Sequence, residues 1–506
     1  MKSHAGEYRR EQFALTTRNE APANSVNLSV AMVSPEIAPF AKTGGLADVI
    51  GSLPQALERL GLRVCLIMPA YRTVLQSNFV LEDTGIRITV PVSRRTEEGT
   101  LLKTKTGNGI TVYLIRADRY FDRDYLYGTP RGDYSDNAER FVFFTRAVLE
   151  VLKHDRPHIL HAHDWQSALS IAFLKAQPEL YPELSPVKTV FTVHNLGYQG
   201  VFLPKHWHLL NLKREFFTPE RLEFWGKINF LKGGLVSADA ITTVSPSYAE
   251  EIKTTEHGCG LEGVFRERAG RLVGILNGVD YEIWNPEIDP FIRTKYGPNN
   301  LSVKGACKAE LWRIFGLSGS PELPLIGMVS RFTSQKGFDL LEKAIESLIS
   351  RNLRFVLLGT GDKHYQEFFR RLPAKYPGKI GVRIAFDESL AHKIIAGADM
   401  FLMPSQYEPG GLTAVYSLKY GTIPVVRATG GLRDTIGEFN SDTKQGEGFG
   451  FTSYEVVEFL ETIDRALSFF YRKEEWMTLI KNATMADFSW SRSARAYLDL
   501  FQKLAG

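Results

Sequence analysis

Several short motifs place glycines beside charged or polar residues at the ends of apolar runs, and the first of them is Lys42, Thr43, Gly44 and Gly45. Paired glycines let backbone N–H groups approach an anion at a helix start, and the lysine adds positive charge, so the motif predicts a diphosphate ligand. It matches neither G-x-G-x-x-G nor a P-loop, which disfavours generic dinucleotide binding and kinase activity. A tight turn with an exposed lysine is the alternative interpretation.

A second motif is His161, Ala162, His163, Asp164 and Trp165. The two histidines resemble metal ligands, but no third ligand lies close in the sequence, so we expect no metal here. Asp164 precedes a predicted helix, and its carboxylate can either cap that helix or bind a sugar hydroxyl.

The run FTVHNLGYQG, residues 191–200, places His194 and Asn195 after another predicted strand. Their side chains can donate to hydroxyl groups, and the main-chain carbonyls of this loop can face a developing positive charge. A loop histidine that simply satisfies its own hydrogen bonds is the alternative.

Two cations, Arg331 and Lys336, share one predicted strand-to-helix loop within SRFTSQKG, residues 330–337. The arginine offers a two-pronged donor and the lysine a point charge, so both can bind the same phosphates.

The last motif begins at Glu408 and continues into a predicted helix. It reads Glu408, Pro409, Gly410, Gly411, Leu412 and Thr413. The proline restricts the backbone and the glycines open it, so the carboxylate is held in place while helix N–H groups face a ligand. Such a carboxylate suits sugar hydroxyls or a developing positive charge, although a glutamate near a helix start also stabilises the helix dipole.

The elements that must hold these motifs alternate between strands and helices. Short apolar runs bounded by turn residues predict buried parallel strands at 28–34, 63–68, 158–163, 187–193, 240–245, 325–329, 355–358, 400–403 and 423–426. Helical spacing of apolar residues predicts helices at 46–60, 138–153 and 338–348, whereas 79–116 has the pattern of hairpins.

This alternation predicts an α/β fold with two Rossmann-like, doubly wound domains that face each other across a deep cleft. We expect an N-terminal domain over residues 28–274, which carries the Lys42 loop and the acceptor side, and a C-terminal donor domain over 275–488. Residues 489–506 form a last helix, and residues 1–27 are expected to be a solvated tail.

Composition excludes several classes of protein. The 506 residues include 61 Lys and Arg against 57 Asp and Glu, a net charge of +4 without blocks of like charge, which predicts no binding to nucleic acid or membranes. Three separated cysteines fit neither a disulfide framework nor a zinc motif, so we expect a cytoplasmic protein. No apolar run reaches the roughly 18 residues of a membrane span, and residues 1–27 lack the apolar centre of a secretory signal.

Taken together, the motifs resemble those of bacterial glycogen synthases and plant starch synthases. The resemblance runs from about Leu28 to the C-terminus, and the shared motifs, in order, are KTGGL, HAHDW, FTVHNLGYQG, SPSYA, LNGVD, SRFTSQKG, EPGGL, KYGTIPVVR, TGGLRDT and DFSW. It implies a GT-B fold, whose last helix crosses back to the first domain. It also implies a retaining transfer of glucose, without a metal or other cofactor, from ADP-glucose to the non-reducing end of an α-1,4-glucan.

The resemblance also implies roles for single residues. Arg331 and Lys336 would neutralise the departing ADP, while Glu408 and His194 would act on the transferred glucose. Those expected to bind the donor are Lys42, Gly44, Gly45, Asp164, Asn277, Gly410, Gly411, Leu412 and Thr413.

One residue departs from the family pattern: many relatives read EPCGL, whereas this chain has Gly410. A cysteine there is therefore not required by this protein's chemistry. Alternative functions are a retaining transferase that uses UDP-glucose or a small acceptor, a phosphorylase, and a glucan-binding protein without activity. The phosphorylase is disfavoured because no cofactor lysine is identifiable, and the non-catalytic protein because Glu408, Arg331 and Lys336 are all present.

Overall fold

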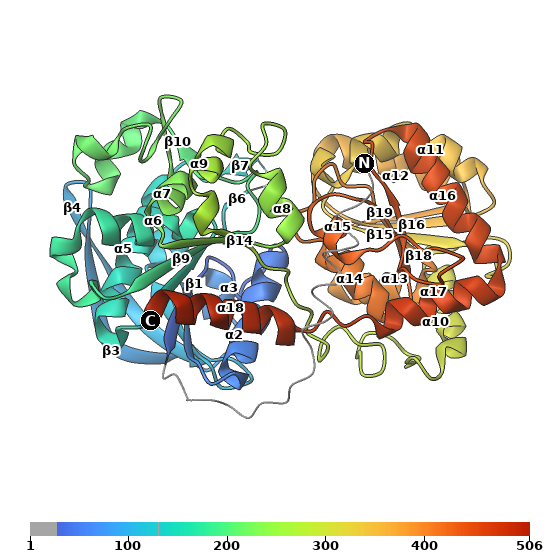
Figure 1. Ribbon diagram of the computed structural model, residues 1–506, viewed down its shortest axis with the longest axis horizontal. Helices are drawn as coiled ribbons and strands as arrows, with labels where there is room; N and C mark the ends of the chain where they lie inside the picture. The colour runs from blue at the N-terminus through green and yellow to red at the C-terminus, as the bar shows by residue number, and fades with distance from the viewer. Residues whose placement is uncertain (1–27, 130) are drawn as a thin grey trace.

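The computed structural model describes residues 28–129 and 131–506, so the predicted tail, residues 1–27, lies outside the described residues. The described chain forms two α/β domains that lie side by side, each built on its own sheet and its own hydrophobic core (Figure 1). The predicted fold class is confirmed.

The first sheet has nine strands in the order β14-β13-β9-β8-β1-β2-β5-β4-β3. They are β1 (Ser29–Val33), β2 (Arg63–Pro69), β3 (Glu82–Val92), β4 (Arg95–Lys105), β5 (Thr111–Arg116), β8 (Ile159–His163), β9 (Lys188–Val193), β13 (Ala240–Thr243) and β14 (Leu272–Gly274). The strands from β14 to β5 are parallel, and β1 is buried along its whole length, as its continuous apolar sequence predicts.

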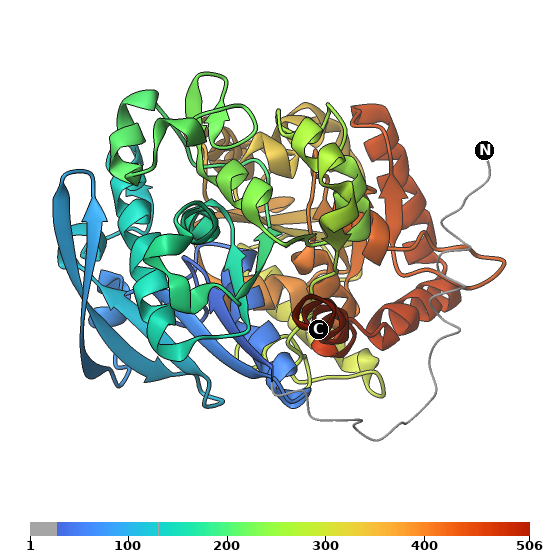
Figure 2. The same ribbon diagram turned by 60° about the vertical axis from the view of Figure 1, so that its left-hand side comes forward.

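Strands β3, β4 and β5 pair antiparallel, as the predicted hairpins require, and extend the sheet on the side away from the second domain (Figures 1 and 2). A separate small sheet joins β10 (Val201–Phe202), β12 (Lys227–Asn229) and β11 (Glu223–Phe224), and two-residue strands β6 (Gly128–Thr129) and β7 (Gly132–Asp133) pair with each other.

Helices cover the first sheet. They are α2 (Gly45–Arg59), α3 (Arg72–Leu75), α4 (Asp118–Phe121), α5 (Asn137–Asp155), α6 (Trp165–Ala176), α7 (Phe230–Ser237), α8 (Pro246–Glu251) and α9 (Glu262–Glu267). The predicted apolar face of α2, which includes Val49, Ile50, Leu53 and Leu57, is buried in the first core.

The second sheet is entirely parallel and has the order β17-β16-β15-β18-β19-β20. Its strands are β15 (Leu325–Val329), β16 (Arg354–Gly359), β17 (Ile380–Ile384), β18 (Met400–Met403), β19 (Ile423–Arg427) and β20 (Phe449–Phe451). Its helices are α10 (Lys304–Phe315), α11 (Phe338–Ser350), α12 (Lys363–Lys375), α13 (Glu388–Gly397), α14 (Leu412–Lys419), α15 (Gly430–Thr435), α16 (Val456–Tyr471) and α17 (Lys473–Met485). The strand order reverses between β15 and β18, where sheets of this topology bind their ligands.

The last helix, α18 (Trp490–Ala505), leaves the second domain and lies on the first, end-on in the view of Figure 2. It packs against α2, and its residues Trp490, Ala494, Tyr497 and Phe501 belong to the first core. The chain therefore passes between the domains twice.

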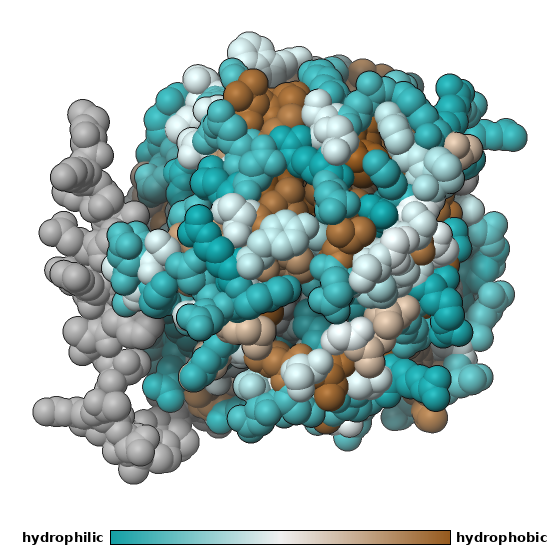
Figure 3. Space-filling model, turned by 90° about the vertical axis from the view of Figure 1, so that its right-hand side faces the viewer, coloured by the Kyte–Doolittle hydropathy of each residue, from teal (hydrophilic) through white to brown (hydrophobic). Residues whose placement is uncertain are grey.

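The second domain presents mostly hydrophilic side chains with smaller apolar areas between them on its outward face (Figure 3). Within residues 28–129 and 131–506, every helix is too short or too polar to traverse a bilayer.

Candidate active site

The predicted site residues lie in loops at the carboxyl ends of strands that are neighbours in space. In the first sheet, Asp164 follows β8 and His194 follows the adjacent strand β9. In the second, Arg331 follows β15 and Glu408 lies beyond the adjacent strand β18. Both groups of loops therefore lie where parallel α/β sheets bind ligands.

Glu408 and Lys336 form an ion pair. The Lys336 ammonium nitrogen lies 2.6 Å from Oε2 of Glu408, and the Ser405 hydroxyl donates to the same oxygen at 2.9 Å. Glu408 is only 6% exposed, so its negative charge is compensated within the protein rather than by bulk water. The fold thus brings together Glu408, which was predicted to act on the transferred glucose, and Lys336, which was predicted to neutralise the departing ADP.

Glycines shape the loop that carries Glu408. Gly411 has a φ of +70° and is the N-cap of α14, a backbone conformation that favours glycine. Leu412 and Thr413 open α14, so their backbone N–H groups belong to the first turn, where no intrahelical acceptor exists. Leu412 packs against the cores of both domains, so this helix start lies at the domain junction.

Arg331 reaches the first domain. Its Nη1 donates to the hydroxyl oxygen of Tyr198 at 3.1 Å, and its guanidinium carbon lies 5.6 Å from the centre of the same ring. Nearby, the Asn195 side-chain amide donates to Gln335 at 3.4 Å. The predicted phosphate-binding loop therefore touches the loop that carries His194.

The Asp164 side chain accepts the backbone N–H of His194 at 2.8 Å and makes no capping hydrogen bond to α6. Asp164 has a φ of +56°, and its carboxylate bonds to the loop after β9 rather than to its own helix. Of the two predicted roles, side-chain capping is wrong, and sugar binding stays a prediction.

Burial shifts the pKa values of both Asp164 and His194. Removal from water raises the pKa of Asp164 from 3.8 to about 7, although backbone N–H groups of His194 and Asn195 oppose the shift. Burial lowers the pKa of His194 to about 3, so its imidazole is neutral at pH 7. Nε2 of His194 lies 3.0 Å from Nδ1 of His163, so one imidazole donates to the other.

The other histidine of the second motif, His161, bonds through Nε2 to Thr192 Oγ1 at 2.6 Å, and its ring centre lies 4.0 Å from that of His163. Among the residues that the structure describes, no group of three or more His, Cys, Asp or Glu side chains has the arrangement of a metal site.

Lys42 lies at the start of α2 and pairs with Asp48 at 2.8 Å and, across the domain junction, with Glu388 at 3.5 Å. Burial opposes its charge, but these two carboxylates outweigh that effect and raise the pKa of Lys42. Gly44 precedes α2, and a Cβ added there would meet nothing within 4 Å, whereas one at Gly45 would lie 3.5 Å from Leu412 of the second domain. Lys42 pairs with Asp48 and Glu388, whereas Lys336 pairs with Glu408 and Arg331 donates to Tyr198, so these three cations have different partners.

Glu36, which none of the sequence motifs includes, organises this loop. Its buried carboxylate accepts the Thr43 backbone N–H, the Thr43 hydroxyl at 2.6 Å and the Tyr127 hydroxyl at 2.7 Å. Burial is the main reason that the pKa of Glu36 is raised. Its position just beyond β1 was the signal in the sequence that could have identified it.

Asn277 and Gly410 meet at the junction of the domains. A Cβ built on Gly410 would lie 3.3 Å from Nδ2 of Asn277 and 3.6 Å from Val244. Oδ1 of Asn277 is buried and makes no hydrogen bond to any described residue. The amide is therefore next to the Glu408 loop, and its role in donor binding stays a prediction.

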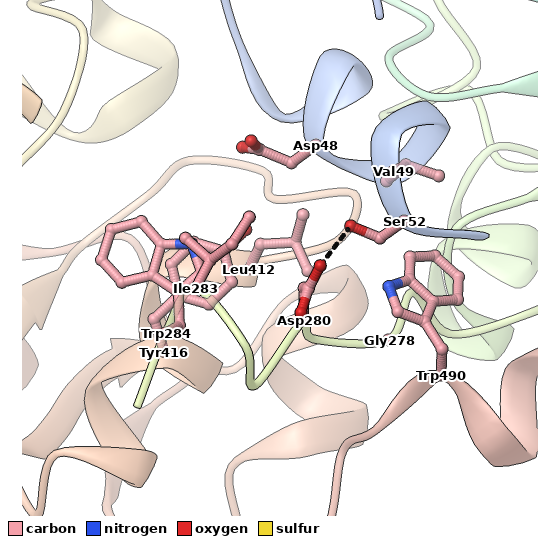
Figure 4. A pocket seen from close by; sticks show the side chains of 10 residues that line it. All are labelled: Asp48, Val49, Ser52, Gly278, Asp280, Ile283, Trp284, Leu412, Tyr416 and Trp490. Atoms are coloured by element: carbon pink, nitrogen blue, oxygen red, sulfur yellow. Dashed lines mark hydrogen bonds between the residues drawn. The ribbon is translucent and has the colours of Figure 1, made fainter. Parts of the chain in front are cut away.

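A crevice of about 10 Å³ lies at the domain junction, between α2 and the segment that follows Asn277 (Figure 4). Ser52 donates to Asp280 across it at 3.4 Å, and its lining residues are Asp48, Val49, Ser52, Gly278, Asp280, Ile283, Trp284, Leu412, Tyr416 and Trp490. It is too small for a nucleotide or a sugar.

Comparison with known proteins connects this arrangement to two families. Residues 29–267 match the starch synthase catalytic domain, and residues 315–483 match glycosyl transferases group 1. Glycogen synthase of Koribacter versatilis is 48% identical over 478 residues, 94% of this chain and 98% of that protein. Glycogen synthase of Pseudothermotoga lettingae is 44% identical over 485 residues, 94% of this chain and 99% of that protein.

Among solved structures, the catalytic domain of starch synthase IV from Arabidopsis thaliana, bound to ADP and acarbose, has a TM-score of 0.88 and 31% identity. The match covers 95% of this chain and 99% of that one. Sucrose-phosphate synthase from Thermosynechococcus elongatus shares the fold, with a TM-score of 0.58 and 17% identity. The match covers 94% of this chain and 99% of that one.

Proposed function

Because the chain belongs to the glycogen synthase and starch synthase family of glycosyltransferases, we propose that it transfers glucose from ADP-glucose to the non-reducing end of an α-1,4-glucan. The observation that carries this proposal is the ion pair of buried Glu408 with half-buried Lys336, in a loop region that contacts the first domain beside His194. That arrangement supplies both charges that glycosyl transfer requires.

Breaking the bond between glucose C1 and the diphosphate leaves positive charge on the sugar ring and negative charge on ADP. Lys336 and Arg331 stabilise the departing diphosphate, and Lys42 adds a third positive charge from the first domain. When the donor binds, its phosphates replace Glu408 as the partner of the Lys336 ammonium. They also replace Tyr198 as the partner of the Arg331 guanidinium. The N–H groups of Gly411, Leu412 and Thr413 at the start of α14 face the same anion.

Glu408 and the main-chain carbonyl of His194 stabilise the ring charge, while Asp164 accepts a hydroxyl of the transferred glucose. The neutral His194 imidazole does not act as a general acid, since its pKa lies at about 3. Gly44, Gly45, Gly410 and Asn277 leave room for the donor to approach the backbone.

Retention of configuration follows from attack on one face. Retaining glycosidases usually pair a nucleophilic carboxylate with a second carboxylic acid about 5–5.5 Å away. Glu408 is paired instead with Lys336 and Ser405. The acceptor 4-hydroxyl therefore attacks C1 on the side of the leaving phosphate, and a phosphate oxygen takes the hydroxyl proton.

The three cations supply the positive charge that a metal provides in other phosphate-transferring sites, so we include no metal or other cofactor in the reaction. The protein acts in the cytoplasm on a neutral polymer, which agrees with three free cysteines, Cys65, Cys259 and Cys307, and a net charge of only +4. The donor nucleotide is supported by the ADP bound to starch synthase IV.

A donor panel tests the proposal. Release of nucleoside diphosphate is measured with ADP-glucose and UDP-glucose side by side, with glycogen as acceptor. Faster release from ADP-glucose supports the proposed donor. Faster release from UDP-glucose would assign the chain to the alternative donor, and release that does not depend on glycogen would contradict the proposed acceptor.

A further inference from the structure

Helix α8 contains the SPSYA motif, residues 245–249, to which the proposed reaction gives no role. The helix begins with Ser245, whose hydroxyl accepts the Tyr248 backbone N–H at 3.0 Å, and with Pro246 in its first turn. It follows β13, the strand next to β9, so it lies beside the loop that carries His194. Its side chains contact the active-site loops of both domains.

Toward the first domain, α8 holds the His194 loop. The Tyr248 hydroxyl accepts the backbone N–H of Leu196 at 3.1 Å, and both side chains are buried. Leu196 lies two residues beyond His194, so the position of this main chain depends on α8.

Toward the second domain, α8 contacts α15 and the turn before it, which belong to TGGLRDT, residues 429–435. Glu251 accepts the Gly430 backbone N–H at 2.8 Å and the Thr429 hydroxyl at 3.2 Å. Ser247 donates to Asp434 twice, through its backbone N–H at 2.8 Å and its hydroxyl at 2.6 Å. These bonds to carboxylates join the domains and exist only while the domains are together.

The turn that Glu251 holds supports Glu408 directly. The Gly431 backbone N–H donates to the carbonyl oxygens of Glu408 at 3.0 Å and of Pro409 at 3.1 Å. A Cβ on Gly430 would lie 2.2 Å from the Glu408 carbonyl oxygen, and one on Gly431 would lie 2.4 Å from that of Gly410. The packing is too close for the turn to move without moving the Glu408 loop.

We propose that Ser247 and Glu251 are positioning residues, which set the distance between Glu408 and His194 by clasping the TGGLRDT turn to α8 when the domains close. The inference rests on the proposed roles of Glu408 and His194. The bonds of the clasp join α8 to the TGGLRDT turn and involve none of the three proposed cations, so the clasp acts on the geometry of the site rather than on the diphosphate.

The test compares Glu251→Gln with Glu250→Gln in the full-length protein. Glu250 is the neighbouring carboxylate on α8, but it is exposed and pairs with Lys253 of its own domain. Glu251→Gln replaces one carboxylate oxygen, an acceptor, with an NH₂ group, a donor, so the side chain can no longer accept both the Gly430 N–H and the Thr429 hydroxyl as the carboxylate does. The kcat with saturating ADP-glucose and glycogen is therefore expected to fall about tenfold. The KM for glycogen and the melting temperature stay close to the wild-type values, and Glu250→Gln keeps the wild-type kcat.

A double-mutant cycle with Ser247→Ala and Asp434→Asn keeps the idea testable if Glu251→Gln folds poorly. Both single variants are expected to lose kcat, and the double variant to lose less than the sum of the two effects, because both substitutions weaken the bond between the Ser247 hydroxyl and the Asp434 carboxylate. Wild-type kcat in Glu251→Gln and in both members of the cycle would overturn the inference, as would an equal loss in Glu250→Gln. Failure of the proposed function is separate, since it would appear as wild-type protein that transfers no glucose.

Discussion

Lys336 and Glu408 lie 72 residues apart in the chain, yet their charged atoms are 2.6 Å apart in the second domain. The sheet order explains this, because β15 and β18 are neighbours although β16 and β17 come between them in sequence. The two groups that would meet opposite charges of the transition state therefore neutralise each other until a donor separates them.

Replacement of this lysine tests the leaving-group role. Lys336→Ala is expected to lower kcat by about 10²- to 10³-fold, the usual cost of removing one group that stabilises developing charge. The KM for glycogen changes little, because Lys336 does not face the acceptor in the proposed reaction. Steady-state kinetics measures both parameters, and Lys343→Ala, an exposed lysine of the following helix, is the control. A variant that loses glycogen affinity but keeps its rate would contradict the assignment.

Asp164 predicts opposite effects of pH on activity and stability. Its folded-state pKa of about 7 lies above the ordinary 3.8, so between about pH 4 and 7 the folded protein retains a proton that the unfolded chain releases. The contribution of Asp164 to the free energy of unfolding therefore falls as the pH rises through this window. Activity rises over the upper part of it, because the carboxylate accepts a sugar hydroxyl better than the acid.

Asp164→Asn isolates these effects. The variant is expected to lose the ionisation near pH 7 from the profile of kcat/KM and to flatten the pH dependence of unfolding by denaturant. Profiles that keep their wild-type shape in the variant would mean that another group titrates there.

The two glycines of the Glu408 loop are expected to differ in their tolerance of substitution. Gly410→Cys introduces the residue of the EPCGL family pattern, and its Cβ would lie 3.3 Å from Nδ2 of Asn277 and 3.6 Å from Val244, so kcat stays within about threefold of wild type. Gly411→Ala places a Cβ 2.6 Å from Leu432 at a φ of +70° and is expected to destabilise the protein by about 1–3 kcal/mol. Steady-state kinetics and thermal unfolding of the two variants test this difference. A larger loss of kcat or of melting temperature in Gly410→Cys than in Gly411→Ala would contradict it.

Trp490 anchors the last helix, α18, to the first domain, so its replacement is expected to lower the stability of the protein. Trp490 is 7% exposed and lies against Gly278, where an added Cβ would come within 2.6 Å of its Cα atom. Trp490→Ala removes a large buried side chain from the first core and is expected to lower the free energy of unfolding by about 3–5 kcal/mol. Arg495→Ala, at an exposed position of α18, is the control. Equal melting temperatures for the two variants would show that Trp490 does not anchor the helix.

The sequence predicted the elements well where the pattern was local. Continuous apolar runs identified β1 and β15, and helical spacing identified α2, because burial on both faces or on one face leaves a direct trace in residue types. It also placed Arg331, Lys336 and Glu408 in loops at the carboxyl ends of strands. It did not predict that these loops are neighbours, because no single segment of the sequence determines the order of strands in a sheet.

Contacts between distant segments could not be predicted. Glu36 is joined to Tyr127, 91 residues away, and Glu251 to Gly430, 179 residues away. Asp164 had the residue type and position of a helix cap, but its carboxylate accepts the His194 backbone N–H instead, and its φ is positive. These relationships depend on how two sheets and two domains pack, which local propensity does not determine.

The central claim is tested most directly by incorporation of labelled glucose from ADP-glucose into glycogen, followed by digestion of the product with β-amylase, for the wild type and for Glu408→Gln. We predict that the wild-type protein incorporates label that β-amylase releases as maltose, and that Glu408→Gln incorporates at least about 10²-fold less. A folded wild-type protein that adds no label, or a Glu408→Gln variant as active as the wild type, would contradict the account.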